Sequence, residues 1–179
     1  MMPDITFDGP GGSTRNQVYK GAHHEEQFTH GRSRFKATAT GTTADPRGYA
    51  AGDVIGEALT FAFNVPLPGK GEITGVRVVD KSGQAPAVDV VVYQSQILGT
   101  GDRGQADPTD SDIGYIVGGV SVLAADYRTF ANNSAASVSC GLTFNANTSG
   151  YLMAEIVARQ ALALIDGGDI IVTLLGVID

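Results

Sequence analysis

The segment SVSCGLTFN, residues 137–145, constrains the fold most, because apolar residues occupy every second position in it. These residues are Val138, Cys140, Leu142 and Phe144. Successive side chains of a β-strand point to opposite faces, whereas a helix brings together residues three or four positions apart. An uninterrupted period of two therefore predicts a strand with one buried face and one solvated face.

Other apolar runs of strand length are separated by turn sequences such as PLPGKGE, KSGQAP and IDGGD. These runs include LTFAFNV, ITGVRVVD, AVDVVVYQ, YIVGGVSVL, YLMAEIVAR and IIVTLLGVI. The 24 glycines and the low share of charged residues, 17%, also favour a turn-rich β protein over a helical one. Roughly eight short strands at short intervals predict an all-β fold, an antiparallel β-sandwich of jelly-roll type.

The last run, IIVTLLGVI, is apolar on both faces. Ile170, Val172, Leu174 and Ile178 fall on one face, and Ile171, Leu175 and Val177 fall on the other. A strand that is apolar on both sides is either central in a sandwich or covered by another subunit. We therefore expect a homo-oligomer with Ile171, Leu175 and Val177 in the subunit interface.

The composition of residues 1–37 predicts an extended N-terminal arm, which precedes a sandwich body of residues 38–179. The arm contains the glycine-rich FDGPGGSTRNQ, and its apolar residues are spaced singly. Ordering such a segment costs roughly 1–2 kcal/mol of backbone entropy per residue, so it needs a partner surface. The residues expected to bind that partner are Tyr19, Phe28, Arg32, Arg34 and Phe35.

One short helix is expected within DPTDSDIGYI. Asp107 is the predicted N-cap, Pro108 the first helical residue, and Asp110 lies near the helix N-terminus. The acidic residues of this stretch could also bind calcium, but their spacing does not match an EF-hand loop. Helix capping explains Asp107 and Asp110 without a metal.

Cys140 is the one cysteine, so the chain can form no internal disulfide and no cysteine metal cluster. A nucleophilic thiolate needs a base and an electropositive setting. Cys140 instead falls between Val138 and Leu142 on the predicted inward face, and no histidine follows His30 in the sequence. We expect Cys140 to be a core residue.

All three histidines lie in the stretch KGAHHEEQFTHGRSR, which raises the alternative of a zinc or nickel site. His23 and His24 are adjacent, and His30 is six positions beyond His24. The stretch lacks the His-Glu-x-x-His pattern, and metal sites favour rigid elements that fix the ligands. We expect a solvated or partner-bound arm, no catalytic residue, no metal ligand and no cofactor, and thus a protein that is not an enzyme.

The net charge of −7 is unevenly distributed. Up to Ala50 there are six basic and five acidic residues, and after it there are six basic and fourteen acidic residues. An acidic body argues against nucleic-acid binding, which needs a basic footprint. No apolar run reaches the ~18 residues of a membrane span, and no secretory leader is evident, so we expect no membrane partner and synthesis in a cytoplasm.

Several segments of the body resemble the capsid decoration (cement) proteins of tailed bacteriophages. The resemblance covers residues 49–179 and includes YAAGDVIGEALTF, GEITGVRVVDKSGQAPAVDVVVYQS, DIGYIVGGVSVLAADYRTFANNS and GYLMAEIVARQALALIDGGDIIVTLLGVID. It implies a β-sandwich on the outer surface of the virion capsid, often as a trimer. It also implies a structural virion protein that clamps neighbouring major capsid protein subunits.

Besides a metal-dependent hydrolase that uses the histidines, two other functions remain open at this point. One is a different virion component, such as a tail or head-fibre protein. The other is a carbohydrate-binding β-sandwich module, which the absence of tryptophan and the 7% aromatic content disfavour.

Overall fold

The computed structural model describes residues 15–20, 23–28, 33–41, 48–62, 69–145, 151–162 and 170–179. The chain forms two compact units, one of residues 1–33 and 179 and the other of residues 34–178. In the first unit, β1 (Arg15–Lys20) pairs antiparallel with β2 (His23–Phe28). The sequence does not predict this hairpin, because RNQVYK and HHEEQF are mostly polar and show no apolar alternation.

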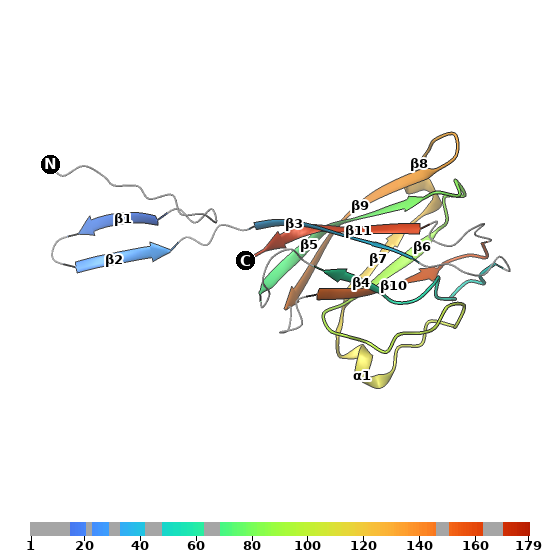
Figure 1. Ribbon diagram of the computed structural model, residues 1–179, viewed down its shortest axis with the longest axis horizontal. Coiled ribbons are helices and arrows are strands. Elements are labelled where there is room, and N and C mark those ends of the chain that lie inside the picture. The colour runs from blue at the N-terminus through green and yellow to red at the C-terminus, as the bar shows by residue number, and fades with distance from the viewer. Residues whose placement is uncertain are drawn as a thin grey trace. The chain divides into compact units, whose positions relative to one another are not determined.

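The second unit is an all-β sandwich of two antiparallel sheets (Figure 1), as the apolar alternation predicts. The five-stranded sheet has the order β3 (Ser33–Thr40), β11 (Ile170–Ile178), β5 (Lys70–Asp80), β9 (Ser134–Asn145) and β8 (Tyr127–Thr129). The four-stranded sheet has the order β4 (Leu59–Ala62), β10 (Tyr151–Ala158), β6 (Val88–Tyr93) and β7 (Ile116–Val122).

The strand pairing is that of a jelly roll. The strands from β3 to β6 alternate between the two sheets and pair, in reverse order, with later strands: β3 with β11, β4 with β10, β5 with β9 and β6 with β7. In a jelly roll the first half of the chain pairs antiparallel with the second half, and the paired halves wrap around one core. The short strand β8 is an addition at the edge of the five-stranded sheet, beside β9.

The core lies between the two sheets and is built from the inward residues of nearly every strand. Its fully buried side chains include Phe61, Ile73, Val90, Leu152, Ile156, Val172 and Leu174. In β9, Phe144 is buried, and Val138, Cys140 and Leu142 pack against the core, while the residues between them are exposed. The predicted period of two in this strand is confirmed.

The body begins with β3, earlier than the sequence indicates. Residues 33–37, which the sequence assigns to the arm, are part of this strand. Phe35 packs against the core and meets Phe144 edge to face, with ring centroids 6.0 Å apart and an interplanar angle of 81°. The ring of Phe35 thus packs against the body's own core, and its contact with a partner stays a prediction.

A buried carboxylate shapes the turn that follows β5. Asp80 is 0% exposed and accepts hydrogen bonds from Ser82 N (2.8 Å), Ser82 Oγ (2.5 Å), Ala85 N (2.9 Å) and Ser134 Oγ (3.3 Å). Such a ring of donors compensates for the loss of water around a buried charge. The predicted turn KSGQAP is thus fixed from inside the sandwich.

The expected short helix is α1 (Asp110–Ile113), but its cap differs from the prediction. Thr109 is the N-cap, and its Oγ1 accepts a hydrogen bond from Asp112 N at 3.2 Å. Asp107 lies upstream, where its backbone N donates to Thr100 Oγ1. Sequence alone ranks both residues as good caps, and the threonine has the required spacing to the helix.

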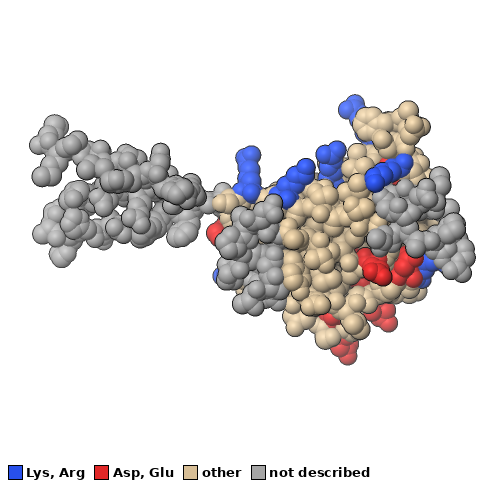
Figure 2. Space-filling model, viewed as in Figure 1, with Lys and Arg blue, Asp and Glu red and all other residues tan. Residues whose placement is uncertain are grey.

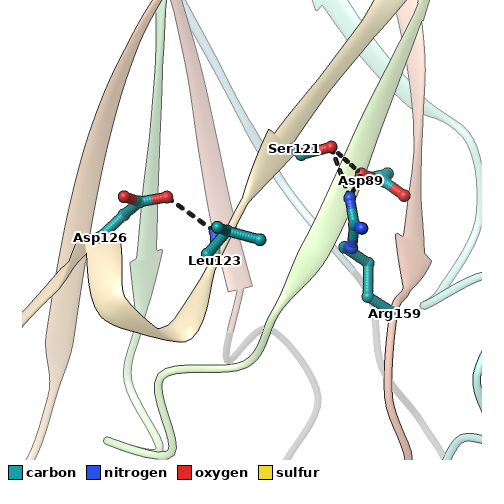
Figure 3. Close-up of polar contacts among 5 residues, drawn as sticks. All are labelled: Asp89, Ser121, Leu123, Asp126 and Arg159. Carbon is teal, nitrogen blue, oxygen red and sulfur yellow. Dashed lines mark hydrogen bonds and ion pairs between the residues drawn. The ribbon is translucent and has the colours of Figure 1, made fainter.

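A single 3₁₀ turn, Ala124–Asp126, joins β7 to β8. The Asp126 carboxylate accepts a hydrogen bond from Leu123 N at 2.8 Å and so holds this turn closed (Figure 3). None of the helices in the described ranges has the length and apolar character needed to cross a bilayer.

Candidate docking face

The outer surface of the five-stranded sheet carries most of the body's exposed cations. Five of them alternate with inward residues of β3, β5 and β8, and we call these five outward side chains and their sheet surface the basic face: Arg34, Lys36, Lys70, Arg77 and Arg128. In the described strands of this sheet the carboxylates are Glu72, on the same face, and the buried Asp80. A local excess of positive charge therefore lies on an acidic chain.

Figure 2 shows this separation of charge. Lys and Arg side chains stand along the side of the body that carries β3, β11, β9 and β8, and most of the visible Asp and Glu lie on the other side, toward α1. A surface of one sign on a protein of the opposite net sign favours partners with complementary charge.

The strand register places apolar residues between these cations. Ile171 pairs with Val79, Val79 with Ala135, and Ala135 with Arg128, so an apolar row crosses the sheet and ends at a cation. The next row contains Thr173, which pairs with Arg77 and exchanges a 3.1 Å hydrogen bond with Thr38. Cross-strand neighbours on one face lie ~5 Å apart, so the cations and the apolar residues form one continuous surface.

The three residues predicted to form a subunit interface all belong to this surface. Ile171 and Val177 are half-buried, and Leu175 is 36% exposed on the outside of the sheet. The structure places them beside the cations of the basic face, most of which carry no distinguishing pattern in the sequence. Their contact with another subunit stays a prediction.

Where β9 crosses the basic face, most of its outward side chains are short and project little above the sheet. The outward residues of β9 are Ser137, Ser139, Gly141 and Thr143, and all four are exposed. A low, mixed apolar and cationic surface offers area and charge for docking to another macromolecule.

The residues predicted to bind a partner through the arm belong to both units of the chain. Tyr19 lies in β1 and Phe28 in β2, where only the backbone is described, and Arg32 lies outside the described residues. Arg34 is exposed on the basic face, and Phe35 is in the core. Among the described side chains, Arg34 is thus placed where it can meet a partner.

A second surface concentrates exposed apolar and acidic side chains, and we call it the α1 surface. It is formed by the connection between β6 and β7 and by the start of β7. Its exposed apolar residues are Leu98 (87%), Ile113 (54%), Tyr115 (41%) and Ile116 (38%), and its exposed carboxylates are Asp107 and Asp110. Ile113, Tyr115 and Ile116 lie within four positions of one another at the end of α1 and the start of β7, and such a group of exposed apolar side chains favours a contact surface.

A buried glutamate fastens the connection that carries the α1 surface. Glu155 in β10 is 1% exposed, accepts a 2.8 Å hydrogen bond from the Tyr93 hydroxyl, and accepts another from Thr100 N at 2.5 Å. Burial and the hydrogen bond to Glu155 raise the pKa of Tyr93 well above its usual range. The sequence signal for this anchor is a carboxylate inside an otherwise apolar strand, YLMAEIVA.

Asp102 and Arg103 fix the same connection at a second place. The Asp102 carboxylate accepts hydrogen bonds from the Tyr49 hydroxyl at 2.9 Å and from Gly56 N at 2.7 Å. Arg103 Nε donates to the Gly48 carbonyl oxygen at 3.0 Å. Asp102 and Arg103 of the acidic stretch therefore have a structural role, distinct from the helix capping predicted for Asp107 and Asp110.

The Cys140 side chain has the properties of a core thiol. Its Sγ donates to the Ile73 carbonyl oxygen at 3.3 Å, and burial raises the pKa of the thiol. A raised pKa keeps the sulfur protonated and weakly nucleophilic near neutral pH. This agrees with the core role predicted from the alternation.

In the parts of the chain with described side chains, no three His, Cys, Asp or Glu residues are placed to hold a metal ion. His23 and His24 lie in β2, where the side chains are not described, and His30 lies outside the described residues.

The outer side of the four-stranded sheet carries one exposed ion pair. Arg159 Nη1 lies 3.0 Å from Asp89 Oδ1 and 2.6 Å from Ser121 Oγ, which in turn donates to Asp89 at 2.6 Å (Figure 3). Both charged side chains are more than a third exposed, so the pair contributes at most ~1 kcal/mol. It lies on the sheet opposite to the basic face.

Comparison with known proteins gives no match: no family model, no curated protein and no solved structure is similar to the chain.

Proposed function

We propose that this chain is a structural virion protein that decorates an icosahedral phage head and stabilises it by binding across neighbouring major capsid protein subunits. The observation that carries the proposal is the division of the chain into two compact units, a hairpin-containing unit of residues 1–33 and a jelly-roll body. A protein that bridges neighbouring subunits needs two separate contact surfaces, and two units supply them.

The composition of the N-terminal unit supports a role in attachment. It holds Tyr19 and Phe28 together with Arg15, Lys20 and Arg32 in 33 residues. Aromatic and arginine side chains are enriched among residues that dominate protein–protein contacts. The body then supplies a rigid mass and the basic face.

The resemblance of residues 49–179 to capsid decoration proteins points the same way. Binding to an assembled shell stabilises it by mass action, because the decorating protein binds the assembled state and not the separate subunits. This mechanism requires no catalytic group and no cofactor.

The test is binding to phage heads assembled from major capsid protein. We expect the full chain to cosediment with these heads, and a variant lacking residues 1–32 to bind at least ~10-fold more weakly, because it loses one of the two contact surfaces. The truncation must stop before Ser33, because β3 belongs to the body. The exchange Asp89→Arg with Arg159→Asp is the control, since it moves charges on the sheet opposite to the basic face and leaves residues 1–32 unchanged.

Two results would count against the proposal. Failure of the full chain to bind the heads removes the decorating role, and gold-labelled chain found on tails or fibres of intact particles assigns it to another virion part. Undiminished binding by the truncated variant removes the arm from the mechanism and leaves the body as the attachment surface.

A further inference from the structure

We infer that the basic face of one copy docks on the α1 surface of a second copy, so that the chain self-associates head to tail. The inference concerns the purified chain alone and does not depend on the proposed function. It rests on two exposed surfaces of the same body that both contain apolar side chains and that carry opposite charge.

Charge argues against docking of the basic face on itself. A two-fold symmetric contact brings a surface against its own copy. Here it would oppose the five cations of the basic face with the same five cations, against one carboxylate, the half-buried Glu72, in the described strands. Like charges brought together in an interface disfavour it, so the apolar residues of β11 need a different counterpart.

The α1 surface has the composition of that counterpart. Asp107 and Asp110 are exposed there, and Ile113, Tyr115 and Ile116 follow within a few residues. On the basic face, Leu175, Ile171 and Val79 lie among the cations. Each surface thus offers apolar side chains and an excess of charge opposite in sign to that of the other, and both features are common in specific interfaces.

The α1 surface is also held in place before any contact forms. Glu155 binds Thr100 N, Asp102 binds the Tyr49 hydroxyl, and Gln94 N donates to the Tyr115 carbonyl oxygen at 2.9 Å. Anchors of this kind reduce the entropy that association would otherwise cost. The basic face lies on a sheet and needs no rearrangement either.

Because the two surfaces differ, the contact is heterologous and leaves a free surface of each kind at the ends of every dimer. Such a contact repeats until it closes a ring or extends as a filament. The homo-oligomer that the sequence predicts would thus form through contact of the basic face with the α1 surface.

The experiment is sedimentation velocity of the purified full chain as a function of concentration and salt. We expect self-association at about 50 mM salt and at least a ~10-fold weaker association at about 500 mM, where the Debye length falls from ~14 Å to ~4 Å. Contact of the basic face with itself would instead strengthen as salt screens the cations. A chain that stays monomeric at low salt overturns the inference.

Two charge-reversed variants identify the surfaces. Arg77→Glu with Arg128→Glu, and Asp107→Lys with Asp110→Lys, should each be monomeric, and an equal mixture of the two should associate again, because each then meets an opposite charge. The Asp89→Arg with Arg159→Asp exchange should associate like the unchanged chain. Association that survives either reversal, or a mixture that stays monomeric, excludes this pair of surfaces.

Discussion

Two tyrosine hydroxyls are buried in the body, and they differ in whether a described residue accepts a hydrogen bond from them. The Tyr93 hydroxyl donates to Glu155, whereas the buried Tyr127 hydroxyl has no hydrogen-bond partner among the described residues. Burial raises the pKa of both above the ordinary tyrosine value of 10.0, with further contributions from Glu155 at Tyr93 and from Asp80 and Asp126 at Tyr127. These two side chains therefore link folding to alkaline pH.

The sign of that link follows from the direction of the shifts. Both folded-state pKa values lie above the unfolded value, so the contribution to stability is complete below about pH 10 and is lost as pH rises further. We expect the free energy of unfolding to fall above about pH 10, with each tyrosine contributing up to ~1.4 kcal/mol per pH unit.

Urea unfolding from about pH 8 to about pH 12 measures this slope. Tyr93→Phe and Tyr127→Phe should each make it shallower, and the double variant should make it shallower still. At neutral pH, Tyr127→Phe should cost little because its hydroxyl has no hydrogen-bond partner among the described residues. Tyr93→Phe should cost ~1–3 kcal/mol by leaving Glu155 with one donor fewer. An unchanged alkaline slope in the double variant would contradict the assignment.

At the scale of the elements, β11 and β5 approach closely where β11 changes register with β5 between Leu175 and Gly176. A Cβ added at Gly176 would meet the Glu72 carbonyl oxygen and the Phe35 ring. One contact is backbone and cannot turn away, so the glycine makes room both for the neighbouring strand and for the aromatic pair of Phe35 and Phe144.

Gly176→Ala is therefore expected to destabilise the body by ~1–3 kcal/mol or more, as overpacking does elsewhere. Gly119→Ala is the matched control, because a Cβ at Gly119 in β7 has nothing within 4 Å. That change should be neutral or stabilising by up to ~1 kcal/mol. Equal thermal midpoints for the two variants would show that the strands can separate at Gly176 without cost.

The sequence predicts strands through apolar alternation, so it does not predict the strands that lack this alternation. The periods in SVSCGLTFN and AVDVVVYQ predict β9 and β6, because both strands bury one face in the core. The β1–β2 hairpin and the three-residue β8 carry no such period. For the same reason β3 was assigned in part to the arm: its inward residues are Phe35, Ala37 and Ala39, of which two are small.

Of the basic face, the sequence predicts only the second apolar side of β11. Arg34, Arg77 and Arg128 are 94 positions apart at the extremes and share a surface only because β3, β5 and β8 lie in one sheet. Periodicity shows which residues of a strand point outward, but sheet order and register decide which outward residues are neighbours.

For the whole molecule, the division into two units predicts that the body folds without the first one. A chain beginning at Ser33 should unfold cooperatively with a thermal midpoint within ~3 °C of the full chain, because it keeps every strand of both sheets. A chain beginning at Tyr49 lacks β3 and the core contacts of Phe35. It should lose several kcal/mol, or at least ~6 °C in midpoint.

Differential scanning calorimetry of the two truncated chains measures this difference. A large loss of stability in the chain that begins at Ser33 would show that residues 1–32 are needed for folding of the body. Equal stability of the two truncations would mean that β3 adds nothing to the sandwich.

The pairing of β3 with β11 also sets the order of events in folding. Thr38 and Thr173, which share a hydrogen bond across these strands, are 135 positions apart in the chain. A contact of such long range requires closure of a large loop before it yields any energy, and sandwiches rich in such contacts fold in milliseconds to seconds. During synthesis β3 leaves the ribosome long before its neighbour exists, so its inward Phe35 and unpaired backbone remain open to other chains until β11 emerges.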